Sequence, residues 1–298
     1  MALPPIYKYL DLQGASLTLR NRTFKHAKPS DFNDTEDLTI QRVFSEEAAT
    51  ALDNLVGGVT GVILQHLNDP PACDSPMKEK VALIQQVLRA KPEAAELIKA
   101  ELAKGGGEAV FDVEPMRGRV EAFVNEINEF MQGYRVLCVT THKDSERMWT
   151  DYANNHKGIA LRIEPNIAKD SKFQLFRPVI YRAERPPLYE DAIEFVAGSL
   201  FGDQEARRKL MLEKILYSKT LDWKHESEFR LVVPMRQSEE PWDTLPYHSE
   251  EITELYLGLS MEKQSREEIV YKARAVNPAI AVHCAIRSDD GTLGFHRI

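Results

Sequence analysis

Strand-like and helical stretches occur in blocks along this chain, and their order limits the folds that it can adopt. Short strands are predicted at residues 6–10 and 23–26, and a helical block follows at about 44–131. Strands dominate the remaining sequence, interrupted by a helical stretch at about 189–219 and one later helix. Because strand-like sequence lies on both sides of the first helical block, we expect a single α+β domain over residues 1–298. It would have a mainly antiparallel or mixed central sheet and a helical insertion at about 44–131.

Charge and cysteine content narrow the class of protein. The formal net charge is -8, so nucleic-acid binding across the whole surface is not indicated. Cys73, Cys138 and Cys284 lie far apart, which fits a reducing cytoplasm, and the last two stand in apolar runs typical of inert buried thiols. The N-terminal sequence lacks a signal-peptide pattern, and no run approaches the roughly 18 to 20 apolar residues of a membrane span. We therefore predict a cytoplasmic protein without a membrane partner.

Several common catalytic motifs are absent from the sequence. It contains no G-x-x-x-x-G-K-[ST] or G-x-G-x-x-G phosphate loop, no H-E-x-x-H zinc motif and no G-x-S-x-G nucleophile elbow. These absences argue against a kinase, a nucleotide oxidoreductase, a zinc enzyme and a serine hydrolase. Three polar stretches remain as candidates for a site.

The first polar stretch is KPSDFNDTED, residues 28–37, which follows a predicted strand. An Asx-turn with exposed acids is the favoured interpretation for Asp34 and Asp37. The functional interpretation gives Asn33 or Glu36 a role in holding a neighbouring loop or a ligand.

The second stretch is CVTTHKDSERMWTDYANNHKG, residues 138–158, where a strand ends and a short helix begins near Ser145. The hydroxyl of Thr140 at the strand end, beside a helix N-terminus, can meet an anion. Trp149 and Tyr152 are three residues apart and share a helix flank. Anchoring of the helix to the sheet is the favoured interpretation, and a stacking surface for a nucleobase or a nicotinamide ring is the alternative.

The third stretch is DWKHESEFRLVVP, residues 222–234, in which Glu226, Glu228 and Arg230 would share one face of a strand. Two carboxylates so close together repel one another unless a cation lies near them, and Arg230 could neutralise one of them. Such a pair marks either a functional site or a salt-bridged strand face. The sequence leaves both interpretations open.

These stretches, with YKY at residues 7–9, occur in the order seen in a large bacterial family catalogued as a domain of unknown function, which the chain resembles. The family's markers are similar to Y-[KR]-[YF], F-N-D-x-x-E, L-C-[FV]-[ST], M-W-x-x-Y-A-x-x-x-x-G and W-x-x-E-x-E-[YF]-R. The resemblance spans nearly the whole chain. In FNDTED, Asp37 stands where the family's acid would fall, with Glu36 one position earlier.

A second resemblance, to ADP-ribosyltransferases, implies an activity. Those enzymes order their sites as a polar residue on an early strand, a serine or threonine ending a middle strand, and a late E-x-E turn. Lys8 or Tyr9, then Thr140, then the turn from Glu226 to Glu228 stand in that order, with Lys8 in place of that branch's arginine. The resemblance implies NAD as substrate and Glu228 as the catalytic carboxylate, which would hold the ribose 2′-hydroxyl and stabilise an oxocarbenium-like centre. Glu226 would orient the acceptor nucleophile, and Thr140 would support the nicotinamide-binding strand.

We expect these groups to gather around a nucleotide-like small molecule in one polar cleft. The catalytic pair would be Glu228 and Glu226. The nucleotide would be bound by Tyr7, Lys8, Tyr9, Asn33, Thr140, Trp149, Tyr152 and Arg230. The sequence names no acceptor and no protein-bound metal. A toxin or phage-defence role would suit a transferase of this kind.

Two other classes of protein stay open. A metal-dependent phosphodiesterase or nuclease would take oxygen ligands from the acids of two stretches, Asp34, Glu36, Glu226 and Glu228. In a non-catalytic sensor or interaction protein, the same motifs would be structural. Trp149 and Trp223 would then anchor the core, and the acids of the third stretch would form salt bridges that fix the register of the sheet.

Overall fold

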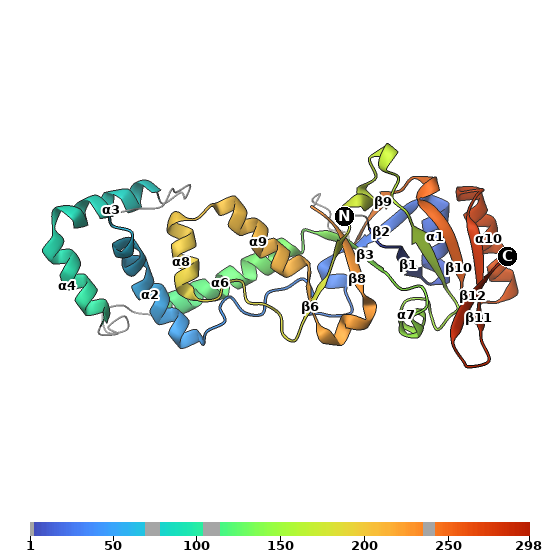
Figure 1. The fold of residues 1–298 in the computed structure, drawn as a ribbon, viewed down its shortest axis with the longest axis horizontal. Coiled ribbons are helices and arrows are strands. Elements are labelled where there is room, and N and C mark those ends of the chain that lie inside the picture. Colours follow the sequence, from blue (N-terminus) through green and yellow to red (C-terminus); the bar gives the residue numbers. More distant parts are fainter. Residues whose placement is uncertain (1–2, 69–77, 104–113, 235–241) are drawn as a thin grey trace. The chain divides into compact units, whose positions relative to one another are not determined.

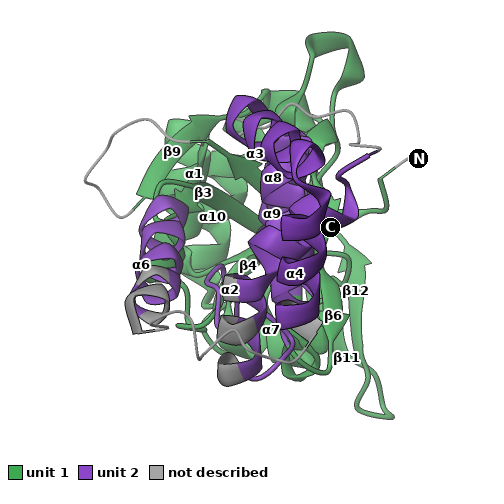
Figure 2. Ribbon diagram, turned by 90° about the vertical axis from the view of Figure 1, so that its left-hand side faces the viewer, with its two compact units in different colours: residues 1–37, 132–184, 219–298 green, residues 38–131, 185–218 purple. Residues whose placement is uncertain are grey.

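The chain folds as two compact units, shown in different colours in Figure 2. The computed structural model describes residues 3–68, 78–103, 114–234 and 242–298. Unit 1 consists of Met1–Asp37, Gln132–Glu184 and Lys219–Ile298, and unit 2 of Leu38–Met131 and Arg185–Ser218. Helices and a large mixed sheet make this an α+β fold, as predicted. A single domain over residues 1–298 with an insertion at about 44–131 stays a prediction.

The large sheet belongs to unit 1 (Figure 1). Its strands are β1 (Ile6–Leu10), β2 (Thr23–Ala27), β3 (Arg135–Thr140), β4 (Ile159–Ile163), β5 (Arg177–Pro178), β8 (Glu228–Val233), β9 (Trp242–Pro246), β10 (Ile252–Leu257), β11 (Ala281–Arg287) and β12 (Leu293–Arg297). They run in the order β12-β11-β10-β4-β1-β3-β2-β9, with β8 paired to β3 and to β5. Strands β10 and β11 pair parallel, whereas β4 pairs antiparallel with both β1 and β10, so the sheet is mixed. Strands β6 (Ile180–Arg182) and β7 (Ser218–Thr220) form a separate two-stranded sheet.

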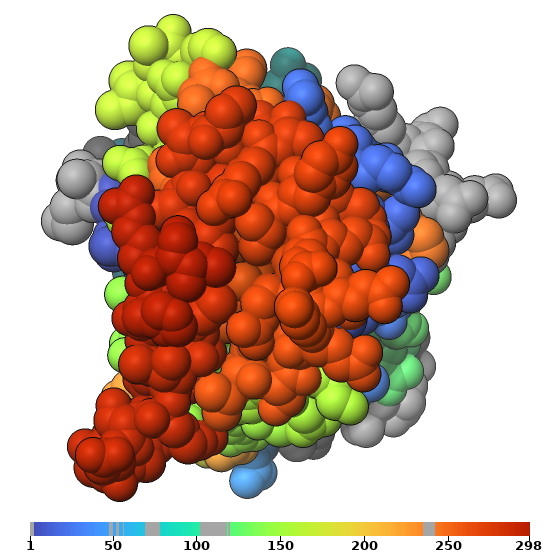
Figure 3. Space-filling model, turned by 90° about the vertical axis from the view of Figure 1, so that its right-hand side faces the viewer, coloured from blue at the N-terminus to red at the C-terminus, as the bar shows by residue number. Residues whose placement is uncertain are grey.

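The two faces of strand β1 belong to different clusters of side chains, because successive side chains of a strand point to opposite sides. Ile6 packs in the main core, which helices α1 (Leu12–Asn21) and α10 (Lys263–Val276) cover. In the view of Figure 3, α10 and the C-terminal strands, coloured orange to red, form much of the visible surface. Tyr7 and Tyr9 instead join an aromatic cluster around Trp149.

Helix α7 (Glu146–Asp151) carries that tryptophan, and its start lies where the sequence predicted it. The side chain of Ser145 caps the helix by accepting from the backbone N–H of Met148. Gly158, which follows the helix, lets the chain pass close to β1, because a Cβ there would lie 2.1 Å from the carbonyl oxygen of Leu10. Helix α7 is thereby fixed at the end of β3, where the polar motifs meet.

Unit 2 contains the described helices α2 (Ala48–Gln65), α3 (Lys78–Ala90), α4 (Pro92–Ala103), α6 (Glu114–Met131), α8 (Ala192–Phe201) and α9 (Gln204–Leu216). Its apolar core joins residues from both chain segments, among them Leu55, Val62 and Val196. In the part of the chain that the structure describes, no helix combines the length and the apolar character needed to cross a membrane.

Candidate functional site

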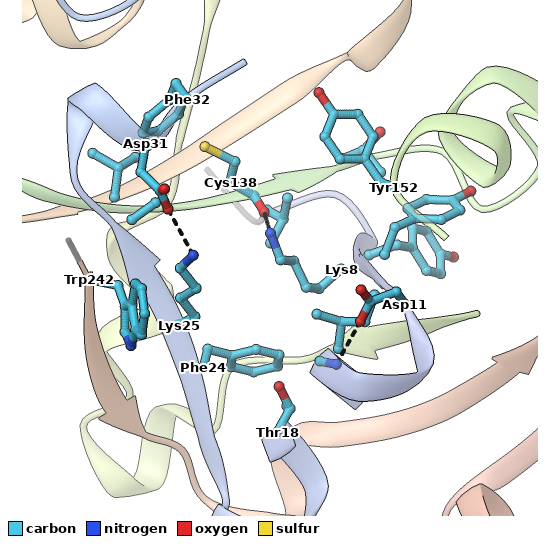
Figure 4. A pocket seen from close by; sticks show the side chains of 18 of the residues that line it. Lys8, Asp11, Thr18, Phe24, Lys25, Asp31, Phe32, Cys138, Tyr152 and Trp242 are labelled. Carbon is cyan, nitrogen blue, oxygen red and sulfur yellow. Dashed lines mark hydrogen bonds and ion pairs between the residues drawn. The ribbon is translucent and has the colours of Figure 1, made fainter. Parts of the chain in front are cut away.

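The two edges of strand β3 are held differently, and a cavity opens beside one of them. Along one edge β8 pairs from Arg135 to Thr140. On the other edge β1 pairs opposite Thr140 and β2 pairs opposite Val136. Between these two points the Lys8 Nζ donates to the carbonyl oxygen of Cys138 at 2.9 Å (Figure 4). Strands β1 and β2 are therefore separated along the middle of β3, and residues of all three strands line the cavity.

The cavity has a volume of about 820 Å³, within the range of roughly 300–1,000 Å³ that is usual for small-molecule sites. Its walls come from β1, one side of α1, β2, β3, α7, β9 and the entry to β8. Aromatic rings and charged groups both contribute, including Phe24, Phe32, Tyr152 and Trp242. The size and lining suit a ligand that has flat rings and charged groups.

One end of the cavity is backed by a buried guanidinium between two carboxylates. Arg230 donates from Nη1 and Nη2 to Asp37 at 3.1 and 2.6 Å. It also donates from Nε and Nη2 to the two oxygens of Glu228 at 2.7 and 2.9 Å. Both contacts are bidentate, the strongest arrangement of this kind of pair. Arg230 therefore holds Glu228 in a fixed orientation at the cavity wall.

A lysine connects this pair to the second glutamate. Lys219 Nζ lies 2.6 Å from Glu226 Oε2, 3.3 Å from Glu228 Oε2 and 3.6 Å from Asp37 Oδ2. The other oxygen of Glu226 accepts a hydrogen bond from the hydroxyl of Tyr152. Both glutamates and Lys219 line the cavity, so this charged network forms its acidic end.

The network shifts the pKa values of its members. Burial raises the pKa of the Glu228 carboxyl, but Arg230 and Lys219 outweigh burial and bring it down to about 2. Burial disfavours the charged form of Lys219, yet Glu228 and then Glu226 raise its pKa above the ordinary value. Burial, followed by the Glu226 carboxylate, raises the pKa of Tyr152. At neutral pH, Glu228 is thus an anion, Lys219 a cation and Tyr152 a proton donor.

The other side of the cavity carries lysines and aromatic rings. Lys25 pairs with Asp31 at 2.7 Å and lies 4.5 Å from the centre of the Trp242 ring. Lys8 extends toward β3 between these groups and Tyr152 in Figure 4. Burial lowers the pKa of Lys8, with Glu228 and Glu226 opposing the shift. This side offers positive charge next to flat rings.

All but two of the residues predicted for the site line this one cavity. The lining residues among them are Tyr7, Lys8, Tyr9, Asn33, Thr140, Tyr152, Glu226 and Glu228. Arg230 is fully buried and acts on Glu228 and Asp37. Their roles in binding and catalysis stay predictions.

Trp149 does not supply the stacking surface that was the alternative interpretation. It is fully buried, its Nε1 donates to the carbonyl of Lys143 at 2.8 Å, and its ring packs edge-on against Tyr9 at 5.0 Å. It anchors α7 to the sheet, as the favoured interpretation had it. Tyr152, three residues later, reaches Glu226 and the cavity instead.

Two expectations from the sequence were wrong in detail. Asp37 is not an exposed turn residue, because it is 1% exposed and pairs with Arg230. The turn itself is present at Asp34, whose Oδ1 accepts from the backbone N–H of Glu36 at 3.0 Å. Glu226 does not lie on the strand with Glu228. It ends the 3-10 segment Leu221–Glu226, and the left-handed Ser227 separates it from β8.

Sequence reasoning did not single out Lys219, Lys25 or Trp242. Lys219 follows a helical stretch, and Trp242 lies on a strand, β9, that was not predicted. The one sequence signal for Asp37 was that it stands at the final, acidic position of the F-N-D-x-x-E marker. Nothing in the local sequence indicates that Lys219 lies against three carboxylates, because Asp37 is distant in the chain.

The cysteines are placed as follows. Cys284 is buried in the main core, and Cys138 is half-buried at the cavity wall. Burial, followed by the Glu228 carboxylate, raises the pKa of the Cys138 thiol well above the ordinary value, so the thiol is protonated at neutral pH. Cys73 lies outside the described residues. Among the residues that the structure describes, no group of three or more His, Cys, Asp and Glu side chains could hold a metal ion.

Fold and cavity together define the class of protein: an α+β protein whose unit 1 has a cavity of small-molecule size lined by charged, aromatic and aliphatic side chains. Residues 148–231 match the model of a family described as "Protein of unknown function (DUF2971)". The matched segment runs from α7 into β8 and includes Tyr152, Lys219, Glu226, Glu228 and Arg230. The specific family markers and the ADP-ribosyltransferase-like order stay predictions. No curated protein and no solved structure matches the chain.

Proposed function

We propose that the chain binds NAD in the cavity of unit 1 and transfers its ADP-ribose group, in the manner of an ADP-ribosyltransferase. The observation that supports this most is the placement of Glu226 and Glu228 on the same cavity as Lys8 and several aromatic rings. An anionic wall, a cationic group and flat apolar surfaces are what a dinucleotide with a diphosphate and two rings requires.

Each end of the cavity suits a different part of NAD. Lys8 and Lys25 supply positive charge for the diphosphate, and the exposed ring of Trp242 offers stacking surface beside Lys25. The nicotinamide riboside would lie toward Thr140 and the glutamates. Lys8 replaces the arginine of the resembling enzymes and meets phosphate as a point charge instead of a bidentate fork.

The chemistry follows from where charge develops. The bond between the nicotinamide nitrogen and ribose C1′ breaks, and its electron pair leaves with nicotinamide. C1′ gains oxocarbenium character and then bonds to an oxygen or nitrogen of the acceptor, which gives up a proton. Glu228, ionised and held by Arg230, is a preorganised anion beside that developing cation. Glu226 would accept the acceptor's proton.

Release of nicotinamide from NAD tests the proposal. The wild type should release nicotinamide, and Glu228→Gln should lower the rate on the order of 100-fold or more, since it removes a preorganised charge. Glu262→Gln, an exposed acid outside the cavity lining, is the matched control and should keep the wild-type rate. Equal rates in wild type and Glu228→Gln would contradict the proposed role of Glu228.

A second candidate is a non-catalytic sensor that binds a nucleotide-like molecule in the same cavity. The observation that favours it is that the oxygens of both glutamates already have protein partners. Arg230 contacts both oxygens of Glu228, while Lys219 and Tyr152 contact those of Glu226. Binding of ADP-ribose without any release of nicotinamide from NAD would support the sensor over the transferase. The proposed toxin or phage-defence role applies only if the protein is a transferase.

A further inference from the structure

Lys219 is the cation of the charged network that reaches the cavity. Its residue is 5% exposed, and its ammonium contacts Glu226, Glu228 and Asp37 at 2.6, 3.3 and 3.6 Å. The same ammonium lies 4.5 Å from the centre of the Trp223 ring. Carboxylates together with an aromatic face are the surroundings in which proteins recognise cations.

Lys219 lowers the excess of negative charge in the network, because three carboxylates face two cations when it is present and one cation when it is absent. Asp37, Glu226 and Glu228 are carboxylates, whereas Arg230 and Lys219 are cations. Arg230 is fully buried between Asp37 and Glu228, so it stays in place whatever enters the cavity. Lys219 lines the cavity, and its charge therefore acts directly on a ligand at the acidic end.

We propose that Lys219 determines the charge of the ligand that this end of the cavity accepts. Its ammonium occupies the position among the carboxylates that a positively charged ring would otherwise take. The inference rests on the proposed function in so far as the ring is the nicotinamide of NAD. That ring carries a positive charge in NAD and none in NADH. With Lys219 present, two cations oppose the three carboxylates, and the preference for the charged form is small. Without Lys219, the exposed negative charge favours the cation.

The test compares two small rings that differ in charge, the 1-methylnicotinamide cation and neutral nicotinamide. Their dissociation constants are measured by calorimetry with wild type, Lys219→Met and the control Lys224→Met, which changes an exposed lysine of the 3-10 segment that follows β7. We expect Lys219→Met to bind the cation on the order of tenfold or more tightly than wild type, with nicotinamide unchanged. Lys224→Met should equal wild type. Equal cation affinity in Lys219→Met and wild type would overturn the inference.

A rescue measurement covers the case in which Lys219→Met folds poorly. Ethylammonium chloride should raise the melting temperature of Lys219→Met above its value in sodium chloride at the same ionic strength, and it should leave Lys224→Met unchanged. The milder Lys219→Gln variant, which keeps hydrogen-bond donors for the carboxylates, should respond in the same direction. No response to ethylammonium in either Lys219 variant would overturn the inference.

The two proposals fail separately. If the wild type neither binds nor cleaves NAD, the proposed function is wrong, while the comparison of 1-methylnicotinamide with nicotinamide still decides the role of Lys219. If the wild type cleaves NAD and Lys219→Met shows no gain for the cation or for NAD over NADH, the role of Lys219 is wrong and the transferase stands.

Discussion

Unit 1 contains two charged clusters of the same chemical kind in different surroundings. In one, Arg230 pairs with Glu228 at 2.7 Å, and their side chains are 0% and 4% exposed. In the other, Arg162 pairs with Glu254 at 2.5 Å, and their side chains are 29% and 20% exposed. Each cluster also has a tyrosine that donates to a glutamate, Tyr152 to Glu226 and Tyr256 to Glu254.

The difference in burial decides what each cluster can do. The Arg162 pair is partly solvated, so water can replace a lost partner and salt weakens the attraction. The Arg230 network is closed off from water on one side and meets the cavity on the other. A buried pair is costly to break, and a fixed charge in such surroundings acts strongly on a ligand. Burial and contact with the cavity are the reasons why the proposed function rests on the Arg230 network and not on the Arg162 pair.

The largest expected effect separates the two arginines. Arg230→Met leaves Asp37 and Glu228 buried without their cation, and we expect it to lower the free energy of unfolding by roughly 3–5 kcal/mol. Arg162→Met should cost roughly 0–1 kcal/mol because its pair is partly exposed. Urea unfolding of both variants measures the difference. Equal losses would show that burial does not distinguish the clusters.

Acid should destabilise the protein through Glu228. Its pKa is about 2 in the folded protein against an ordinary 4.5, so the folded state binds fewer protons than the unfolded state in this interval. The resulting stability, roughly 3 kcal/mol, is present above about pH 4.5 and is lost as the pH falls toward 2. Glu228→Gln cannot titrate and should lose this part of the pH dependence, whereas Glu254→Gln should lose less. Free energies of unfolding measured between pH 2 and pH 4.5 check this prediction. Parallel plots of unfolding free energy against pH for wild type and Glu228→Gln would contradict it.

Lys8 should contribute to binding through its charge. Lys8→Met should weaken the binding of ADP-ribose about tenfold, because it removes a cation that lines the cavity. Lys263→Met, whose side chain is 91% exposed, is the control and should bind like wild type. Since burial lowers the pKa of Lys8, affinity should fall with rising pH earlier than for an ordinary lysine. Calorimetry at several pH values measures both effects, and unchanged affinity in Lys8→Met would remove Lys8 from the site.

The smallest expected effect concerns the two tyrosines. Tyr152→Phe removes a hydrogen bond to the buried Glu226 and should cost roughly 1 kcal/mol of stability. Tyr256→Phe removes the matching bond to the more exposed Glu254 and should cost roughly 0.5 kcal/mol. Thermal unfolding of both variants measures which of them loses more stability. The reverse order would mean that solvent reaches Glu226 more readily than Glu254.

Local sequence patterns predicted much of the fold that carries this site. The strand at residues 6–10, the start of α7 and the entry to β8 follow from side-chain period and capping residues, which depend on neighbours in the chain. The need for a cation beside Glu228 also followed from local charge, and Arg230 supplies it.

The rest of the site depends on distant pairing, which such patterns do not contain. Asp37 and Arg230 are 193 residues apart, and the turn signals around Asp34 gave no hint that Asp37 turns inward. Lys219 contacts Asp37 only through the tertiary fold, because the two residues are distant in the chain. The wall that Trp242 forms requires β9 to pair with β2, with Ala27 opposite Trp242.

A thermal titration of the wild type with NAD, ADP-ribose, ATP and Mg²⁺ tests the central claim, that the cavity is an NAD site, most directly. At about 100 times its dissociation constant a ligand adds roughly 2.7 kcal/mol, which raises the melting temperature visibly. We predict a rise with NAD and with ADP-ribose, which Lys8→Met diminishes, and none with Mg²⁺ alone. A rise with Mg²⁺ alone, or no response to any nucleotide, would contradict the claim.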